Sequence, residues 1–324
     1  MGFIGSNFIR YMLSTHRDLQ VVNIDKLSYG ASPANLKPNE RDRRYSFARG
    51  DINNQELLAR QVRDIDVMVN FAAESHVDRS IANPWPFVRS NIDGTLSILE
   101  AIRRNPGETK LIQVSTDEVY GDVQNGSVDE GAKLAPSSPY AVSKAAADML
   151  CLAYRKTYGL NLSITRCTNN FGPNQFPEKL IPKTIIRARK NLGVPVYGRG
   201  KNVRDWIYVT DHCQALNLVV ESGKAGEVYN IAGHNELETG TLVKDILKIM
   251  GSRSHVEFVD DRPGHDLRYS LDDRKIRHEL GWKPRYSLRN ALEDTVNWYL
   301  RNVQWWQPLA SKKVLGPSPW KNKW

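Results

Sequence analysis

The sequence contains little cysteine: three thiols, Cys151, Cys167 and Cys213, in 324 residues. All three are widely spaced and lie in apolar segments, which is typical of buried free thiols. An odd number of such cysteines gives no disulfide framework. None of them accompanies a Cys–His signature. The sequence therefore argues against both disulfide stabilisation and a cysteine nucleophile.

Long apolar runs are absent as well. No stretch of eighteen or more apolar residues occurs, so the sequence predicts no membrane span. The first residues lack the basic and then apolar pattern of a secretory signal, and we therefore expect a cytoplasmic protein. The histidines show no metal-ligand spacing, so no metal site is predicted.

Acidic residues are fewer than basic ones, with 36 Asp and Glu against 45 Lys and Arg, a net charge of +9. This charge raises the alternative of a nucleic-acid-binding module. However, most basic residues are interleaved with acidic ones or lie on a helix face, where solvated side chains are expected. No zinc finger, RNP-type motif or continuous basic helix is found. We expect no nucleic-acid partner, and note that an anionic substrate also needs arginines.

The length of the chain favours about two domains. In the first part, short β-branched runs alternate with helical patterns, which predicts an α/β fold with a doubly wound parallel sheet. Ligands of such sheets bind at the carboxyl ends of the strands. The expected strands are 21–25, 45–51, 66–73, 110–116 and 162–168, and the expected helices are 5–14, 54–63, 87–104 and 140–158.

Proline and glycine become frequent after Asn170, and the regular alternation ends. We therefore predict a first domain at 1–170 and a smaller mixed α/β domain at 171–324, with returns to the first sheet near 204–232. From about residue 305 an irregular tail is expected. Further strands are predicted at 204–209 and 228–232, and helices at 211–222, 242–250, 273–280 and 288–302.

Tyr140 and Lys144 are four residues apart in a segment with helical character, so they share one helix face. Ser138 before Pro139 is a typical helix start. A lysine ammonium beside a phenol favours the phenolate and lowers the tyrosine pKa. The pair therefore predicts a base that removes a proton from a sugar hydroxyl; the alternatives are a core tyrosine and a surface lysine.

Asp117 and Glu118 follow Thr116 where a strand is expected to end. Two carboxyls in one site tend to titrate apart, so that one holds a proton while the other is ionised. Together with the tyrosine base, they predict oxidation coupled to elimination. The residue pattern does not say which acid is the proton donor, and a solvated turn is the alternative for both.

The ordered set of motifs resembles the extended short-chain dehydrogenases/reductases, and within them the dTDP-glucose 4,6-dehydratases, from Gly2 to about Trp306. The resemblance implies a Rossmann-type domain that binds NAD, a smaller domain that binds a nucleotide-diphosphate sugar, and a homodimer formed through helices 87–104 and 140–158. It rests on Gly2-Phe3-Ile4-Gly5, 72–80, Thr116-Asp117-Glu118, Tyr140-x-x-x-Lys144, 169–173, 176–182, Arg204-Asp205-Trp206 and 261–266.

The resemblance also implies a reaction: dehydration of dTDP-glucose to dTDP-4-keto-6-deoxyglucose, with internal hydride transfer from C4 to C6 and loss of water across C5 and C6. Tyr140 and Lys144 would serve the redox step. Glu118 would take the C5 proton, Asp117 would protonate the departing 6-hydroxyl, and Thr116 would orient the substrate.

The cofactor residues begin with Gly2, Phe3, Ile4 and Gly5, which open a helix in the manner of a dinucleotide fingerprint. Asp25, twenty residues after Gly5, favours NAD over NADP because it would repel a 2′-phosphate. The family carries a strand and a glycine pair before this point, so the first strand of the fold is expected to be missing from this chain. Further cofactor positions implied by the resemblance are Asp51, Ile52, Ala72, Ala73, Asn91, Tyr140 and Lys144.

The substrate residues are implied by the same resemblance. Asn169 and Arg204 would contact the diphosphate, with Arg262 nearby, although pairing of Arg204 with Asp205 and of Arg262 with Asp261 is the alternative. Thr239 stands near a position where the family usually has asparagine, which leaves thymine and uracil nucleotides both open. The other predicted substrate residues are His76, Lys179, Leu180, Pro195 and Tyr197.

Three competing functions remain. A UDP-sugar epimerase, decarboxylase or 4,6-dehydratase is the nearest, although epimerases lack an Asp-Glu pair after the threonine and decarboxylases carry Ser-Glu. A catalytically impaired NAD-binding scaffold is favoured by the missing first strand. A nucleic-acid-binding module would show salt-dependent binding.

Overall fold

The computed structural model describes residues 1–105 and 108–322. Its centre is a parallel four-stranded sheet in the order β3-β4-β5-β9. β9, which lies after residue 204, pairs with β5, so the chain returns to the first sheet. The strands are β3 (Val67–Asn70), β4 (Lys110–Thr116), β5 (Leu162–Cys167) and β9 (Val228–Ile231).

Helices cover both faces of this sheet because successive strand residues point to opposite sides. Leu111 on β4 belongs to an apolar cluster with residues of α2 (Gln55–Gln61), α5 (Gly94–Arg104) and α6 (Pro139–Tyr158). Ile112, the next residue, packs with residues of α8 (Val209–Ser222) and α10 (Arg274–Leu280) on the other face. Both residues are fully buried, so an apolar core packs against each face of the sheet.

β1 (Val21–Asp25) and β2 (Tyr45–Arg49) form a separate parallel pair. Within residues 1–105 and 108–322, no strand pairs both with this pair and with the four-stranded sheet. α1 (Phe3–Thr15) packs against α8 beside them. The expectation of a further strand before Gly2 stays a prediction.

The remaining strands form two small sheets with their own core. The first is β10-β8-β6, with β6 (Asn169–Phe171), β8 (Val203–Tyr208) and β10 (Glu236–Glu238). The second pairs β7 (Val194–Tyr197) with β11 (Val256–Val259). The apolar core beside the first of these sheets contains Phe171, Trp206 and Tyr299, whereas Val194 and Val196 of β7 belong to a separate cluster. The helices here are α7 (Leu180–Arg189), α9 (Thr239–Ile249), α11 (Leu288–Arg301) and α12 (Val303–Trp306).

Several predicted boundaries differ from the observed ones. β2 ends at Arg49 and β3 at Asn70, so residues 71–76 form an irregular segment before α3 (Val77–Ala82). The helix expected at 87–104 consists of α4 (Trp85–Phe87), a π-helical turn at Val88–Asp93 and α5. β8 does not return to the main sheet, since it pairs with β6 and β10. The division into domains at residue 170 stays a prediction.

The chain beyond α12 forms only short turns, but it packs against the rest of the protein. Val314 and Leu315 are buried, and a short 3₁₀ turn, Pro319–Lys321, packs against α3. Other 3₁₀ turns are Pro33–Asn35, Lys37–Asn39, Val62–Asp64 and Asp117–Tyr120. Across the described residues, we find no helix with the length and apolar character that a membrane span requires.

Candidate active site

The centre of the site is the carboxyl end of β4. The strand ends at Thr116, and Asp117 and Glu118 open the 3₁₀ turn that follows. The Thr116 hydroxyl donates to Asp117 Oδ1 at 3.0 Å, and the Glu118 amide approaches Thr116 Oγ at 3.4 Å. Gly121 ends the turn at φ 74°, where a Cβ atom would lie 2.1 Å from the Ala135 carbonyl oxygen. The glycine thus allows the chain to turn away and leaves the two acids at the strand end.

Burial sets the protonation of Asp117. The residue is 3% exposed, and burial, with Glu118 next, raises the pKa of its carboxyl to about 8. Its Oδ2 atom has no hydrogen-bond partner among the described residues. Asp117 is therefore a neutral acid at pH 7 with one oxygen free for a ligand.

Glu118 differs from its neighbour in its electrostatic surroundings. Burial raises its pKa, whereas Arg262, Arg204 and Lys179 lower it. Its Oε2 atom also lacks a partner in the described part of the chain. Burial has the larger effect, so the pKa of Glu118 stays above its ordinary value, but the three cations hold it down, whereas Glu118 raises the pKa of Asp117 further.

α6 carries the tyrosine and the lysine. Ser138 caps this helix by accepting the Ala141 amide at 3.1 Å, Pro139 occupies the first turn, and Gly159 ends it in a left-handed conformation. Tyr140 and Lys144 are 8% and 4% exposed. The predicted start, end and burial side of this helix agree with the structure.

The pKa of Tyr140 differs from the sequence prediction. Burial raises it well above its ordinary value, and Glu118 raises it further, while the Thr116 hydroxyl opposes the shift. The Lys144 ammonium donates to the Val114 carbonyl of β4 at 2.6 Å, and burial lowers its own pKa. Tyr140 and Lys144 are both buried on α6, but desolvation raises the pKa of Tyr140, so the predicted lowering of this pKa is wrong.

A buried ion pair one helical turn from Lys144 was not predicted from the sequence. Asp148, one further turn along α6, binds Arg166 of β5 at 2.9 Å, and both side chains are at most 3% exposed. Arg166 also donates to the Tyr120 hydroxyl at 2.7 Å. Asp148 raises the pKa of Lys144 and so supports its charge. The four-residue spacing from Lys144 to Asp148 was the signal in the sequence that could have revealed it.

At the start of α1, Gly2 is the N-cap and no side chain caps the free amides. A Cβ atom on Gly2 would meet nothing within 4 Å, so the space beside this glycine is open, whereas a Cβ atom on Gly5 would lie 3.5 Å from the Phe71 side chain. Phe3 and Ile4 instead pack into an apolar cluster with α8. Asp25, at the end of β1, accepts the Met1 ammonium at 2.8 Å and the Leu27 amide at 2.7 Å.

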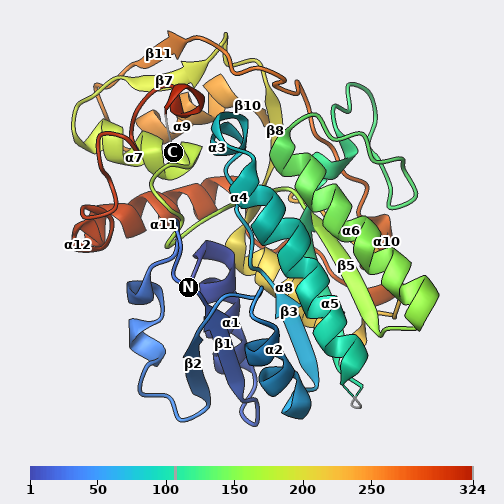
Figure 1. Ribbon diagram of the computed structural model, residues 1–324. Helices are drawn as coiled ribbons and strands as arrows, with labels where there is room; N and C mark the ends of the chain where they lie inside the picture. Colours follow the sequence, from blue (N-terminus) through green and yellow to red (C-terminus); the bar gives the residue numbers. More distant parts are fainter. Residues whose placement is uncertain (106–107, 323–324) are drawn as a thin grey trace.

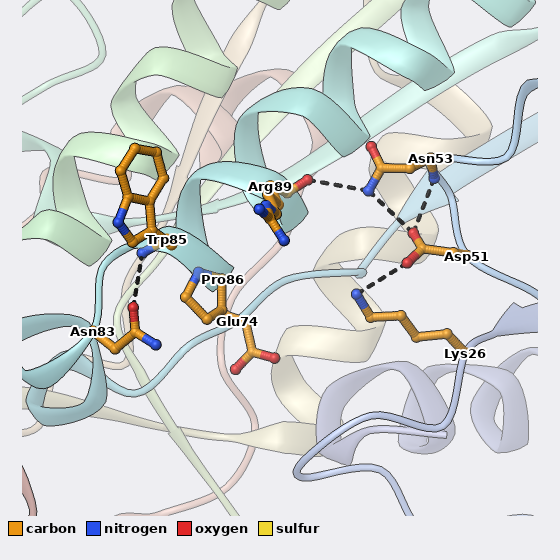
Figure 2. Close-up of a pocket in the computed structure, with 8 residues that line it drawn as sticks. All are labelled: Lys26, Asp51, Asn53, Glu74, Asn83, Trp85, Pro86 and Arg89. Atoms are coloured by element: carbon orange, nitrogen blue, oxygen red, sulfur yellow. Dashed lines mark hydrogen bonds and ion pairs between the residues drawn. The ribbon is translucent and has the colours of Figure 1, made fainter. Parts of the chain in front are cut away.

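A cavity of about 600 Å³ opens beside these strand ends. Figure 2 shows Asp51 in its wall, bound to Lys26 at 3.2 Å and to Asn53. Ile52 lies next to Asp51 and contacts α5 so closely that a Cβ atom on Gly94 would be 2.4 Å from it. Sequence analysis missed the other lining residues, Lys26, Asn53, Glu74, Asn83, Trp85, Pro86 and Arg89.

The segment after β3 holds Ala72, Ala73 and Glu74. The Ala72 amide donates to Asn70, and Asn91 holds both the amide and the carbonyl of Glu74, at 2.9 and 3.0 Å. Asn91 also donates to the Ser143 hydroxyl on α6 at 2.8 Å. Asn91 thus holds the segment that lines the cavity, and its contact with the cofactor stays a prediction.

The predicted substrate arginines lie near the acids but use unexpected partners. The Arg204 guanidinium donates to the carbonyls of Val203, Leu267 and Asp266, and it lies 4.2 Å from the Tyr269 ring centre. The alternative pairing with Asp205 is not found, since Asp205 accepts backbone amides of Gly233 and Asn235.

Arg262 binds Asp78 of α3 at 3.0 Å, and only its backbone amide contacts Asp261. Asp78 also accepts the Tyr197 hydroxyl at 2.6 Å. This aspartate lies in the quoted motif 72–80, yet its role as the link between β7 and Arg262 was not predicted. The link depends on residues more than a hundred positions apart, which no local pattern indicates.

The other predicted substrate residues surround this link. Lys179 donates to the Ser75 carbonyl at 2.7 Å, next to His76, and Leu180 begins α7. Burial lowers the pKa of His76 to about 4, so its ring is neutral at pH 7. His76 Nδ1 and Asn169 Oδ1 are buried and have no partner among the described residues. Pro195 lies on β7, two residues before Tyr197.

Within the described residues, no group of three or more His, Cys, Asp or Glu side chains could hold a metal ion. The fold and this site define a class: parallel α/β proteins that present a Tyr-x-x-x-Lys helix and a Thr-Asp-Glu strand end to one site. Residues 1–295 match the family model described as GDP-mannose 4,6 dehydratase. The chain belongs to this family.

The chain is also similar to individual relatives and solved structures. The chain is 48% identical over 323 residues to a dTDP-glucose 4,6-dehydratase of Streptomyces niveus, covering 98% of this chain and 96% of the relative. It superimposes on a dTDP-glucose 4,6-dehydratase of Streptomyces venezuelae, solved with NAD bound, with a TM-score of 0.93 and 46% identity, covering 95% and 97% of the two chains. A UDP-glucuronic acid 4-epimerase from Bacillus cereus gives a TM-score of 0.87 at 30% identity, covering 93% and 96%.

Proposed function

We propose that this protein is an NAD-dependent 4,6-dehydratase that converts dTDP-glucose to dTDP-4-keto-6-deoxyglucose, a precursor of deoxysugars. The observation that carries the proposal is the neutral, buried Asp117 beside Glu118, which is surrounded by cations. A 4-epimerase needs a tyrosine base but no such acid pair. The NAD-bound dehydratase of Streptomyces venezuelae and the dehydratase of Streptomyces niveus support the same choice.

The residues of this chain fit a dinucleotide. The uncapped amides of α1 suit a pyrophosphate, and the open space beside Gly2 admits it. Asp25, Asp51 and Ile52 would hold the adenosine part, and Ala72 and Ala73 would line the path toward Tyr140 and Lys144. When bound, NAD supplies the acceptor and donor for the hydride, and its positive ring favours the Tyr140 phenolate.

The side chains then have separate tasks. Tyr140 accepts the proton of the sugar 4-hydroxyl, with Lys144 held in place by β4. Glu118 removes the C5 proton after the 4-ketone has made it acidic. Asp117 gives its proton to the 6-hydroxyl, which leaves as water, and Thr116 orients the substrate.

Substrate binding would involve the cationic side of the site. Arg204, Arg262 and Asn169 would hold the diphosphate, since a planar guanidinium makes paired contacts with phosphate oxygens. His76, Lys179, Leu180, Pro195 and Tyr197 would line the remainder of the substrate site. The free buried atoms of His76 and Asn169 support a polar ligand here.

The test is to incubate the protein separately with dTDP-glucose, UDP-glucose and UDP-galactose and to identify the products by mass spectrometry and NMR. We expect the loss of one water from dTDP-glucose. Conversion of UDP-glucose to UDP-galactose would indicate an epimerase. Dehydration of UDP-glucose alone would mean that the substrate carries uridine and not thymidine diphosphate. No conversion of any of the three would favour an NAD-binding scaffold.

We also propose a homodimer in the cytoplasm. α5 and α6 expose apolar side chains, with Leu96 37%, Val142 49% and Met149 62% exposed. Contiguous apolar surface on a soluble domain often marks a protein interface. Figure 1 shows the two helices side by side on one face of the sheet, where they could meet a second copy.

A further inference from the structure

The last residues of the described chain run along α7 and end at the substrate side of the molecule. Arg187 donates to the Leu315 carbonyl at 3.0 Å, and Lys183 donates to the Gly316 carbonyl at 3.3 Å. Lys321 pairs with Asp260 at 2.8 Å. We name residues 314–321 the C-terminal strap; in Figure 1 the red end of the chain lies beside α7 and α3.

The strap places Trp320 against Tyr197. The ring centres are 4.7 Å apart and the rings are nearly perpendicular, at 88°. Perpendicular rings form a corner, in which a planar group can stack on one face and be bordered by the other ring. Trp320 is only partly buried, so part of its side chain is accessible to solvent.

A chain of contacts connects this corner to the reacting centre. Tyr197 donates to Asp78 and Asp78 binds Arg262, whose positive charge lowers the pKa of Glu118. The buried Nε atom of Arg262 has no partner among the described residues. A sugar nucleotide with its hexose at Glu118 and its diphosphate at Arg262 would bring its base to the end of this chain of contacts.

From this geometry we infer that Trp320 is a substrate-binding residue: together with Tyr197 it forms the subsite for the pyrimidine base, held there by the C-terminal strap. The inference rests on the proposed function. Stacking of a base on an aromatic ring is worth about 1–3 kcal/mol, or roughly five- to 150-fold in affinity.

The experiment measures dTDP binding by calorimetry to the full-length protein and to Trp320→Ala, Trp320→Phe and Phe258→Ala. We expect the Kd for dTDP to rise about ten-fold or more in Trp320→Ala and to recover largely in Trp320→Phe, because the phenyl ring restores a stacking face. NAD affinity should not change in any variant. Phe258, 60% exposed on β11, is the matched aromatic control.

Steady-state kinetics give a second readout. A base contact acts on substrate and transition state alike, so Trp320→Ala should raise KM for dTDP-glucose with little effect on kcat. A lower melting temperature with unchanged Kd would show that the strap is only structural and would overturn the inference. Tighter dTDP binding would show that Trp320 blocks the site and would overturn it too. If the unmodified protein binds neither dTDP nor UDP, the proposed function itself fails.

Discussion

At the scale of single residues, the proposed chemistry depends on one carboxyl group, that of Asp117, whose surroundings raise its pKa far above the ordinary value. Asp117 is an acid with a pKa of about 8 because burial and the neighbouring Glu118 disfavour its charge. The nearby cations act mainly on Glu118. Two adjacent acids thus have different electrostatic surroundings, and the variant Asp117→Asn tests what the proton on Asp117 does.

Asp117→Asn removes the transferable proton and leaves the volume unchanged. We expect the variant still to oxidise the sugar but to release dehydrated product about 10²–10⁴ times more slowly, the usual range for loss of a general acid. Rapid-mixing absorbance of the reduced nicotinamide, followed by mass analysis of the product, separates the two steps. Asp64→Asn, an exposed carboxyl, is the control; normal product release by Asp117→Asn would refute its role as the acid.

The same carboxyl predicts a pH dependence of stability. Because its pKa is raised on folding, the folded state binds a proton that the unfolded chain releases above about pH 4. The stabilisation from this proton is complete below pH 4 and decreases as the pH rises to about 8. Asp117→Asn should therefore be more stable than the unmodified protein near pH 8 and similar to it near pH 4. Urea unfolding at both pH values measures this; an equal difference at both would contradict the raised pKa.

At the scale of elements, α6 would serve both the proposed catalysis and the proposed assembly. Its buried side carries Tyr140, Lys144 and Asp148, whereas Val142 and Met149 point outward. This division follows from the helical period, since residues 140, 144 and 148 share one face. The same helix is therefore expected to position the base and to contact a second copy of the chain.

A charge at the outer face of α6 tests the proposed homodimer. Met149→Glu would bury a carboxylate in an apolar interface, which is costly without a partner, so light scattering should give the mass of a monomer at micromolar concentration. Leu192→Glu, on another surface where Leu192 is 43% exposed, should leave the mass unchanged. A dimeric Met149→Glu protein would place the interface elsewhere, and a monomeric unmodified protein would exclude the dimer.

At the scale of the whole molecule, the β1–β2 pair stands apart from the four-stranded sheet in its hydrogen bonding. Val22 and Phe47 on these strands are 45% and 40% exposed. The proposed cofactor residues lie on both sides, with Asp25 on β1 and Ala72 after β3. A bound dinucleotide would therefore connect two parts of the molecule that share few backbone contacts.

This arrangement predicts where NAD stabilises the protein. A hundred-fold excess of NAD over its Kd should add about 2.7 kcal/mol to the free energy of unfolding. Hydrogen exchange measured by mass spectrometry should slow more in residues 21–49 than in β4 and β5, which are already protected by both cores. Equal slowing in both regions, or none with saturating NAD, would contradict the predicted cofactor position.

The sequence alone determined most of the α/β fold and the two motifs of the candidate site. The start of α6 at Ser138 and Pro139, the spacing of Tyr140 and Lys144, and the acids after a buried strand are local features, and local spacing is what a sequence displays. The predicted end of β3 was wrong for a non-local reason: the segment after the strand is held by Asn91, a contact made across seventeen residues.

Only the tertiary structure decided the charges and partners of the site. Desolvation raises the pKa of Tyr140, although the sequence predicted that Lys144 would lower it. The Arg262 side chain pairs with Asp78 and not with its neighbour Asp261, and Asp148 pairs with Arg166. Trp320, near the end of the chain, packs against Tyr197. These pKa shifts and contacts depend on burial or on residues that are distant in sequence. Burial and long-range contacts exist only once the chain has folded.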